Sequence, residues 1–310
     1  MNLAFGCVIG IFLGIVGTLV FTVLPESTAP PENVEWSLIA YEDLEDREFS
    51  VVGETQGIVM VGTDEGVFEV SPNGTALWGL EVNTGVDGCY RASEKKVAFW
   101  VESKGFYVVD KEDGGLMWEL EDKCLSSAGP LDGSTAALIG TSDGAVFEAY
   151  YDGSTDAYWE FSDAAKSRER DEDTVYDVDT YDVSSVVAKD EGFLAASSSF
   201  DVIVEVNDEA VEWSWGSFVI DQPSSVQVLN NGNLLICDSG NRRVVEVSKA
   251  QGVVWEASFK DLRPLGAEQL WNGLVRVTSE EGCAAINLSN EVIWAVTAPG
   301  CRSSRWYFVN

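Results

Sequence analysis

The sequence contains no histidine and few basic residues. Of its 310 residues, 19 are Lys or Arg and 52 are Asp or Glu, which gives a formal charge of −33. The missing imidazole excludes Ser-His-Asp hydrolysis, histidine-ligated zinc and transfer through a modified histidine. The shortage of basic side chains excludes a nucleic-acid-binding protein that works by neutralising phosphates. We therefore expect neither histidine-dependent chemistry nor a nucleic-acid partner.

The acidic excess indicates a protein that works in concentrated salt. At low ionic strength this charge would make the folded chain repel itself, whereas molar salt screens the repulsion. We expect a halophilic archaeon or a virus of one as the source, with an acidic secreted protein of a mesophile as the alternative. Disorder is not expected, because 45% of the residues are hydrophobic and 11 are Trp, enough for a sizeable core.

Cysteine is scarce and does not form a pattern of pairs. One of the six, Cys7, lies in an apolar run near the N-terminus, and the other five follow it. Because five is odd, at least one thiol stays free or pairs between chains. Cys89 and Cys124 fall at similar places in successive sequence repeats and are candidates for a disulfide. Cys237 lies in the apolar segment LLIC and is expected to be buried.

Residues 3–24 form a run without a charged side chain. As a helix, 22 residues extend about 33 Å, which is enough to cross a membrane. A cleaved signal peptide is the competing interpretation, but no basic residues precede the run. No Lys or Arg flanks the run, so the positive-inside rule does not set its orientation. We place the large acidic part, which follows the run, outside and the short N-terminus inside. Residues 1–24 are thus predicted to be a single-pass transmembrane anchor, 25–33 a Pro-rich spacer, and 34–310 an external domain.

Within the apolar run, Gly6, Gly10 and Gly14 recur every fourth residue on one helix face. Small residues at this spacing let a second membrane helix approach closely. The alternative is the ordinary abundance of glycine in membrane helices. The pattern predicts self-association or docking onto another membrane protein.

The external part repeats with a period of about 40 residues. Similar segments each contain two apolar strands, a polar turn and a short strand with Trp. These tryptophans are spaced by 42, 40, 41, 54, 42 and 39 residues: Trp36, Trp78, Trp118, Trp159, Trp213, Trp255 and Trp294. This period is typical of propeller blades. We predict an all-β fold, a β-propeller of six to seven four-stranded blades, with the long interval explained by an acidic surface insertion at 162–182.

The two ends of the external part leave the number of blades open. Residues 34–38 resemble the last strand of a repeat, and 303–310 resemble the first strand at 224–231. The ends either pair as a reduced seventh blade or reinforce a six-bladed ring. We favour seven blades.

Residues that recur once per repeat are expected to have structural roles. The repeated tryptophans favour packing between neighbouring blades over carbohydrate stacking. The same argument favours a structural role for the recurring glutamates, which are Glu69, Glu148, Glu205 and Glu246.

The segment NGNLLICDSGNRRVVEVSKAQGVVWE, residues 231–256, resembles the repeat of arylsulfotransferase-like and quinoprotein-like (PQQ-type) propellers. Its DSGNRRVVEV also looks like an NHL-type repeat. The resemblance covers one repeat well and implies the fold. Arylsulfotransferases carry sulfate on a histidine, and quinoprotein dehydrogenases use a platform such as an adjacent cysteine pair with a calcium site. Because this chain has neither the histidine nor the cysteine pair, the resemblance implies a propeller without that chemistry and without a cofactor. Non-catalytic relatives, such as outer-membrane assembly scaffold lipoproteins, bind protein partners.

The charge is distributed unevenly along the chain. Residues 241–310 contain eight basic and seven acidic side chains, a net charge of +1, so the other 240 residues carry −34. A sector with little net charge in an otherwise acidic protein is suited to a partner, and local ion pairing is the alternative. The candidate partner-binding residues are the six arginines of this sector: Arg242, Arg243, Arg263, Arg276, Arg302 and Arg305.

The aspartates of the insertion could bind a hard cation. They are Asp171, Asp173, Asp177, Asp179 and Asp182. Their spacing lacks the D-x-D-x-D-G-x5-E pattern of a calcium loop. A solvated loop is favoured, so no metal site is assigned.

These observations predict a membrane-anchored external propeller that acts in recognition, adhesion or scaffolding. On a virus it would serve as a spike or attachment protein, and on a cell as an envelope scaffold. Expected partners are membrane lipid through residues 3–24, another envelope protein or a second copy, and a cell-surface receptor or glycan. The alternative is a divergent enzyme of the sulfotransferase-like or glycosidase type, which would need perturbed acids and aromatic side chains at the mouth of the central channel.

Overall fold

In the computed structural model the chain divides into two units, Met1–Pro30 and Pro31–Asn310. The structure describes residues 34–44, 49–53, 57–121, 125–132, 136–160, 182–189, 192–207, 210–216 and 218–308, all in the second unit. The predicted membrane anchor with its three glycines, the spacer and the insertion up to 181 lie outside these ranges. Within them, no helix is both long enough and apolar enough to span a bilayer.

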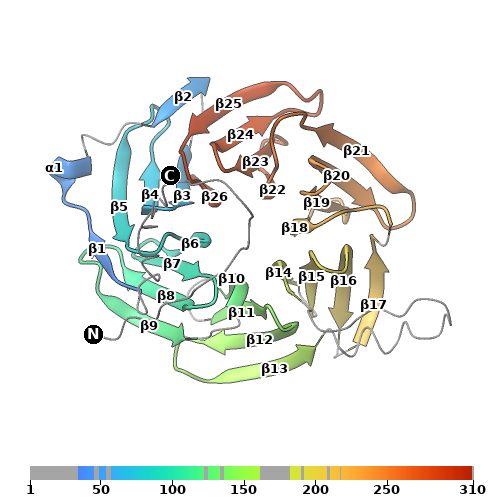
Figure 1. Ribbon diagram of the computed structural model, residues 1–310, viewed down its shortest axis with the longest axis horizontal. Helices are drawn as coiled ribbons and strands as arrows, with labels where there is room; N and C mark the ends of the chain where they lie inside the picture. The colour runs from blue at the N-terminus through green and yellow to red at the C-terminus, as the bar shows by residue number, and fades with distance from the viewer. Residues whose placement is uncertain are drawn as a thin grey trace, which may run out of the picture. The chain divides into compact units, whose positions relative to one another are not determined.

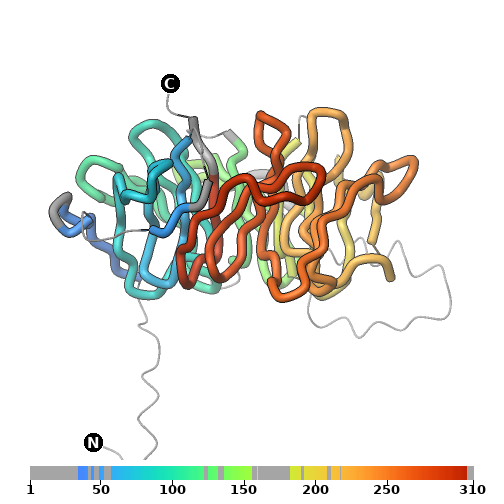
Figure 2. Tube along the Cα trace, turned by 90° about the horizontal axis from the view of Figure 1, so that it is seen from above, coloured from blue at the N-terminus to red at the C-terminus, as the bar shows by residue number. Residues whose placement is uncertain are grey.

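The second unit is a β-propeller of six antiparallel sheets around a central axis (Figure 1). Figure 2 shows the ring from the side. The middle strands of each blade are buried on both faces, because neighbouring blades cover them. Outer strands alternate instead, as in β9 (Leu116–Glu121), where exposed and half-buried residues follow one another. The predicted propeller of short strands is confirmed.

The strands of each blade follow one another in the chain. Blade 1 contains β3 (Gly57–Thr63), β4 (Gly66–Val70) and β5 (Ala76–Val82). Blade 2 contains β6 (Gly88–Ser93), β7 (Lys96–Val101), β8 (Gly105–Asp110) and β9. Blade 3 contains β10 (Leu125–Asp132), β11 (Ala136–Thr141), β12 (Ala145–Tyr150) and β13 (Thr155–Glu160).

The second half of the ring repeats this arrangement. Blade 4 contains β14 (Ser185–Ala188), β15 (Phe193–Ser197), β16 (Val202–Asn207) and β17 (Ala210–Trp215). Blade 5 contains β18 (Pro223–Val228), β19 (Leu234–Asp238), β20 (Arg243–Ser248) and β21 (Gly252–Ser258). Blade 6 contains β22 (Gly266–Gln269), β23 (Val275–Ser279), β24 (Gly282–Ile286) and β25 (Val292–Thr297).

The chain ends close the ring by joining existing blades. The last strand, β26 (Ser303–Phe308), pairs with β3 and becomes the innermost strand of blade 1. Near the N-terminus, β1 (Trp36–Leu38) pairs with the outer edge of β5, and β2 (Ser50–Gly53) with the outer edge of β25. The short helix α1 (Tyr41–Leu44) lies between them in the chain.

This closure corrects the prediction of seven blades. The ring has six, and blades 1 and 6 contain five strands each instead of four. The terminal segments resemble single strands and are too short to build a blade, whereas each finds a free sheet edge to pair with. The alternative that the ends reinforce a six-bladed ring is therefore confirmed.

The recurring tryptophans pack between successive blades, as predicted. Trp78 lies among buried residues of blade 2, and its Nε1 donates a hydrogen bond to the Lys111 carbonyl at 2.9 Å. Trp255 repeats this contact with the Leu288 carbonyl of blade 6 at 3.1 Å. The indoles of Trp78 and Trp255 thus pack against the next blade while their N–H groups are satisfied.

The recurring glutamates also have the structural role that was predicted. Glu69 is buried, and its two carboxylate oxygens bind Arg91 and Lys111 of blade 2, each at 2.5 Å. A buried carboxylate with two cationic partners joins the two blades. The other three glutamates also accept hydrogen bonds from side chains. The donors are Tyr150 for Glu148, Lys189 and Lys249 for Glu205, and Asn231 and Asn233 for Glu246.

Candidate functional site in the central channel

A cavity of about 1240 Å³ runs along the propeller axis and is lined by the inner strands of all six blades. The ring has two rims. At one rim, which we call the crossover rim, the chain passes from blade to blade and the second strand of each blade connects to the third. The opposite rim contains the remaining turns. The cavity therefore has two mouths with different residues around them.

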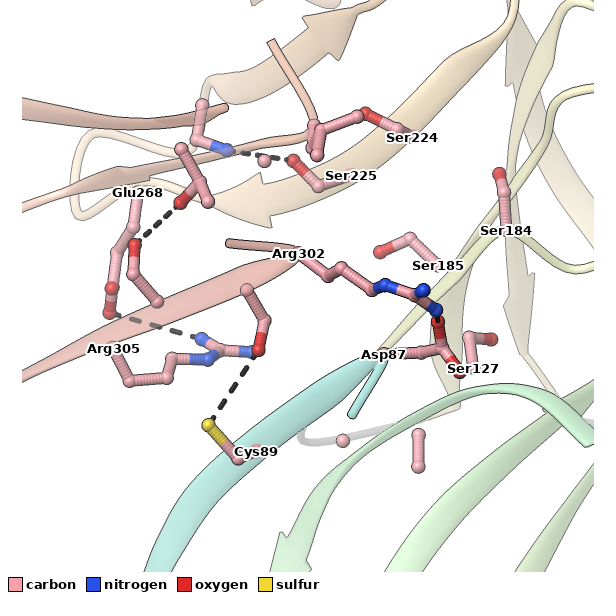
Figure 3. Close-up of a pocket in the computed structure, with 18 of the residues that line it drawn as sticks. Asp87, Cys89, Ser127, Ser184, Ser185, Ser224, Ser225, Glu268, Arg302 and Arg305 are labelled. Carbon is pink, nitrogen blue, oxygen red and sulfur yellow. Dashed lines mark hydrogen bonds and ion pairs between the residues drawn. The ribbon is translucent and has the colours of Figure 1, made fainter. Parts of the chain in front are cut away.

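Pairs of successive serines mark four of the six inner strands. Ser184 Oγ donates to the Pro223 carbonyl of the next blade at 2.6 Å, and the Ser225 Oγ accepts from the Ala267 N–H at 3.0 Å. Inner strands have one edge without a neighbouring strand, so these hydroxyls satisfy backbone groups at that edge. The pairs, several of which are labelled in Figure 3, are Ser126–Ser127, Ser184–Ser185, Ser224–Ser225 and Ser303–Ser304.

Sequence reasoning missed this set of serines. Its signal was present, because the similarity of 303–310 to 224–231 rests partly on the shared Ser-Ser. Two further pairs at the same position of their repeats would have completed the pattern. The serines hold successive blades together at the axis and give the channel a polar wall.

Acidic side chains surround the crossover-rim mouth of the channel. Arg302 bridges two of them, with Nη1 at 2.5 Å from Asp87 and Nε at 2.8 Å from Asp64. Glu102 lies beside them and its backbone N–H donates to Asp87 at 2.6 Å. Burial, followed by the charge of Asp87, raises the pKa of Glu102. Glu280 and Glu281 complete the acidic lining.

Trp100 lies in the wall beside this mouth because residue 88 is a glycine. A Cβ at Gly88 would lie 1.8 Å from Cζ2 of the Trp100 ring. Only glycine lets β6 approach the indole this closely. The mouth therefore combines an acid of raised pKa with an aromatic side chain.

A second charged cluster lies on the channel wall formed by blades 1 and 6. Glu268 of β22 lies opposite Arg276 in the β22–β23 register, and the carboxylate Oε2 is 2.6 Å from Nη2. Its other oxygen is 3.9 Å from Nη1 of Arg305 on β26. Figure 3 shows Glu268 and Arg305 close to Cys89, away from Arg302 and Asp87. Residues far apart in the sequence thus form one cluster.

The structure divides the six arginines predicted to bind a partner. Arg276, Arg302 and Arg305 line the channel. The other three lie on the crossover rim, where Arg242 and Arg263 are exposed. Arg243 is bound at 2.6 Å to Asp238, whose side chain is fully buried, and at 2.9 Å to Glu256. Local ion pairing, the alternative given for this sector, thus accounts for Arg243 and Arg302 and applies in part to Arg276, which pairs with Glu268.

An exposed apolar loop lies beside the rim arginines. Phe218 is 93% exposed and Val219 46%, and the Val219 carbonyl accepts a hydrogen bond from Arg243 at 2.7 Å. We call Phe218, Val219, Arg242 and Arg263 the rim patch. Sequence reasoning missed its apolar half, although Phe-Val between Gly216 and the next strand was visible.

The described cysteines are buried free thiols: Cys89, Cys237, Cys283 and Cys301. Cys89 lies 3.6 Å from Ser303 Oγ, and burial raises its pKa to about 12. The structure gives no support to a disulfide with Cys124, which lies outside the described residues. The predicted burial of Cys237 is confirmed.

The described residues contain no cluster of three or more side chains suited to a metal. Of the aspartates considered for a cation, only Asp182 is described. It accepts hydrogen bonds from Ser197 at 3.1 Å and from the Ser199 N–H at 2.8 Å, and so caps the turn that follows β15.

Comparison with known proteins places the chain by its fold. No protein-family model and no curated protein sequence matches it. A protein of unknown function from Bacteroides caccae is similar in structure, with a TM-score of 0.65, 14% identity, and coverage of 81% of this chain and 99% of that one. The WD40 propeller domain of Doa1 has a TM-score of 0.57 and 16% identity, with coverage of 85% and 87%. BamB from Moraxella catarrhalis has a TM-score of 0.44 and 16% identity, with coverage of 79% and 71%. At 16% identity the similarity to the Doa1 domain shows the propeller fold alone.

Proposed function

We propose that the protein is a non-catalytic binding protein, a membrane-anchored external propeller that engages a protein partner through the rim patch. The observation that carries the proposal is Phe218, an aromatic side chain 93% exposed, whereas the other phenylalanines whose side chains the structure describes are wholly or partly buried.

The backbone at the rim patch supports this role. Phe218 has φ of 69° and Arg242 has φ of 53°, a region that costs a non-glycine residue about 1 kcal/mol or more. Both residues lie in turns, in which the Val219 and Ile220 N–H groups bond to the Gly216 carbonyl and the Arg242 N–H to the Ser239 carbonyl, so the backbone fixes where each side chain starts. Interfaces are enriched in aromatic and arginine side chains, and the rim patch provides both.

The remainder of the proposal rests on the sequence. Residues 3–24 would anchor the propeller in a membrane, and the acidic surface would suit molar salt. The protein would then act as an envelope scaffold on a halophilic cell or as a spike or attachment protein on a halophilic virus. Its partner would be another envelope protein, a second copy, or a cell-surface receptor.

A photocrosslinking comparison tests the proposal. A benzophenone amino acid replaces Phe218 in one variant and Trp271 in another, which is 65% exposed on the opposite rim. Both variants are irradiated in native membranes or virions at high salt. We expect a discrete crosslinked product from position 218 that is lost when Arg242→Glu and Arg263→Glu are added. Equal labelling from positions 218 and 271 would contradict the proposal.

A hydrolase acting at the crossover-rim mouth is the second candidate. Glu102, with its raised pKa, and Trp100 are the kind of acid and aromatic side chain that a glycosidase site needs. Hydrolysis of aryl glycosides that is abolished by Glu102→Gln, but not by Glu280→Gln, would favour this candidate. Activity that is equal in the two variants would exclude Glu102 as its acid.

A further inference from the structure

The guanidinium of Arg276 is incompletely satisfied within the channel wall. Its side chain is 4% exposed and lines the cavity. Nη2 pairs with Glu268, whereas Nε and Nη1 have no hydrogen-bond acceptor among the described residues. Leaving buried N–H groups unpaired costs free energy, the more so on a charged group. A ligand that accepts hydrogen bonds here would remove that cost.

The cluster around Arg276 also has an excess of positive charge. Glu268 is the acidic neighbour of both Arg276 and Arg305, so the three side chains carry a net charge of +1. The nearby thiols do not supply the missing negative charge, because burial raises the pKa of Cys89 to about 12 and that of Cys283 to about 11. Among the charged side chains that line the cavity, this cluster has a positive excess, whereas the acids around Arg302 outnumber it.

We propose that the channel binds a small-molecule oxyanion, a carboxylate or phosphate group, at Arg276 and Arg305. Arginine matches the geometry of both groups. Thr278 and Ser304 also line the cavity, and their hydroxyls lie 2.5 Å apart. One hydroxyl donates to the other, and Ser304 also forms a hydrogen bond with the Cys283 thiol, so the pair makes the wall beside the arginines polar. This site is independent of the rim patch and of any partner bound there.

The two mouths indicate the side from which the ligand enters. The crossover-rim mouth is surrounded by acids that repel an anion, and Arg302 there is already bound to Asp64 and Asp87. The cavity-lining residues at the opposite-rim ends of β10, β14 and β18 are uncharged: Pro130, Ala188, Gln227 and Val228. An oxyanion therefore meets less repulsion from the opposite rim.

Calorimetric titration of the full-length protein in molar NaCl tests the site. The probes are inorganic phosphate and citrate, each at matched ionic strength. Arg305→Gln removes a charge from a side chain that is 38% exposed and should leave the fold intact. Arg242→Gln removes the same charge from the rim patch and is the control. We expect saturable binding of at least one probe, weakened tenfold or more by Arg305→Gln and less than twofold by Arg242→Gln.

Arg276→Met provides a second test, and we expect a folded variant to lose saturable binding. Should this buried substitution prevent folding, the comparison of Arg305→Gln with Arg242→Gln decides alone. Binding of phosphate only or of citrate only supports the site and identifies its class of ligand. Absence of saturable binding for both probes, or equal weakening by Arg305→Gln and Arg242→Gln, would overturn the proposal. Failure at this site would leave the photocrosslinking result at position 218 unaffected.

Discussion

At the residue scale, individual buried ion pairs stabilise the ring. Glu69 is the clearest case, because its carboxylate is 2% exposed and has two cationic partners on the next blade. Breaking a buried ion pair by removing one partner leaves the other charge uncompensated. We therefore expect the contribution of each recurring glutamate to stability to depend on whether its partners are charged.

Substitution Glu69→Ala should lower the free energy of unfolding by about 3 kcal/mol or more. Glu246→Ala is the matched control, because Glu246 accepts from two neutral asparagine side chains and should cost only about 1–2 kcal/mol. Urea unfolding in high salt measures both variants. An equal loss would show that the charges of Arg91 and Lys111 do not matter.

The buried thiols predict how stability changes at alkaline pH. Burial raises the pKa of Cys237 from 9.0 to about 11. Above pH 9 the unfolded chain releases this proton while the folded chain retains it, so stability that is present below pH 9 is lost as the pH rises towards 11.

Comparison of the wild type with Cys237→Ala isolates this thiol. The stability advantage of the wild type should shrink by about 1.4 kcal/mol per pH unit between pH 9 and 11. Urea unfolding at pH 8, 9, 10 and 11 tests the prediction. A difference in stability that does not change with pH would show that burial does not raise the pKa of the Cys237 thiol.

At the residue scale, recurrence in the sequence determined what could be predicted. The tryptophans and glutamates repeat once per blade, so their structural roles followed from spacing. Glu268, Arg276 and Arg305 form one cluster only because β26 joins blade 1 beside blade 6. No spacing in the sequence predicts that these three residues lie together. The sequence likewise does not predict that Phe218 and Arg242 belong to one patch.

At the scale of elements, hydrogen bonds between inner strands determine how one blade is fixed to the next. Ser184 Oγ bonds to the Ala196 carbonyl of its own blade and to the Pro223 carbonyl of the next blade. If the Ser184 hydroxyl is removed, these carbonyls in the wall of the channel lose a hydrogen-bond donor.

Ser184→Ala should therefore destabilise the ring by about 1–3 kcal/mol. Ser154→Ala is the control, since Ser154 lies in an exposed turn and its loss should stay within about 0.5 kcal/mol. Thermal unfolding of the two variants, monitored by tryptophan fluorescence, makes the comparison. Similar midpoints would show that water replaces the Ser184 hydroxyl without cost.

The strands themselves were largely predictable, because apolar runs alternate with Gly, Asn and Asp turns throughout the repeat. The ends were harder to assign. The sequence identified 303–310 as a first strand, but a strand does not specify which free edge it joins. Six blades with two reinforced sheets followed only from the pairing of β26 with β3 and of β2 with β25.

At the scale of the whole molecule, stability depends on closing the ring. Without β26, the inner edge of β3 presents unpaired backbone groups, a template for association with other chains. Blades 1 and 6 would also lose the contacts that β26 makes between them.

Deletion of residues 303–310 should abolish cooperative unfolding and cause aggregation. Deletion of 309–310 alone removes nothing from β26 and serves as the control. Size-exclusion chromatography at high salt and thermal unfolding distinguish the two proteins. A monomeric, cooperatively unfolding chain without 303–310 would show that the ring is stable while open.

Closure by the last strand also fixes the order of events during synthesis. Residue 63, at the end of β3, leaves the ribosome roughly 10–50 s before the final residues at the usual rate of about 5–20 residues per second. Blades 2 to 5 contain all their strands as they emerge, whereas the first blade to be made is the last to be completed. Throughout that interval the nascent chain carries an open strand edge, and a stop codon anywhere between β3 and β26 releases a protein that keeps it.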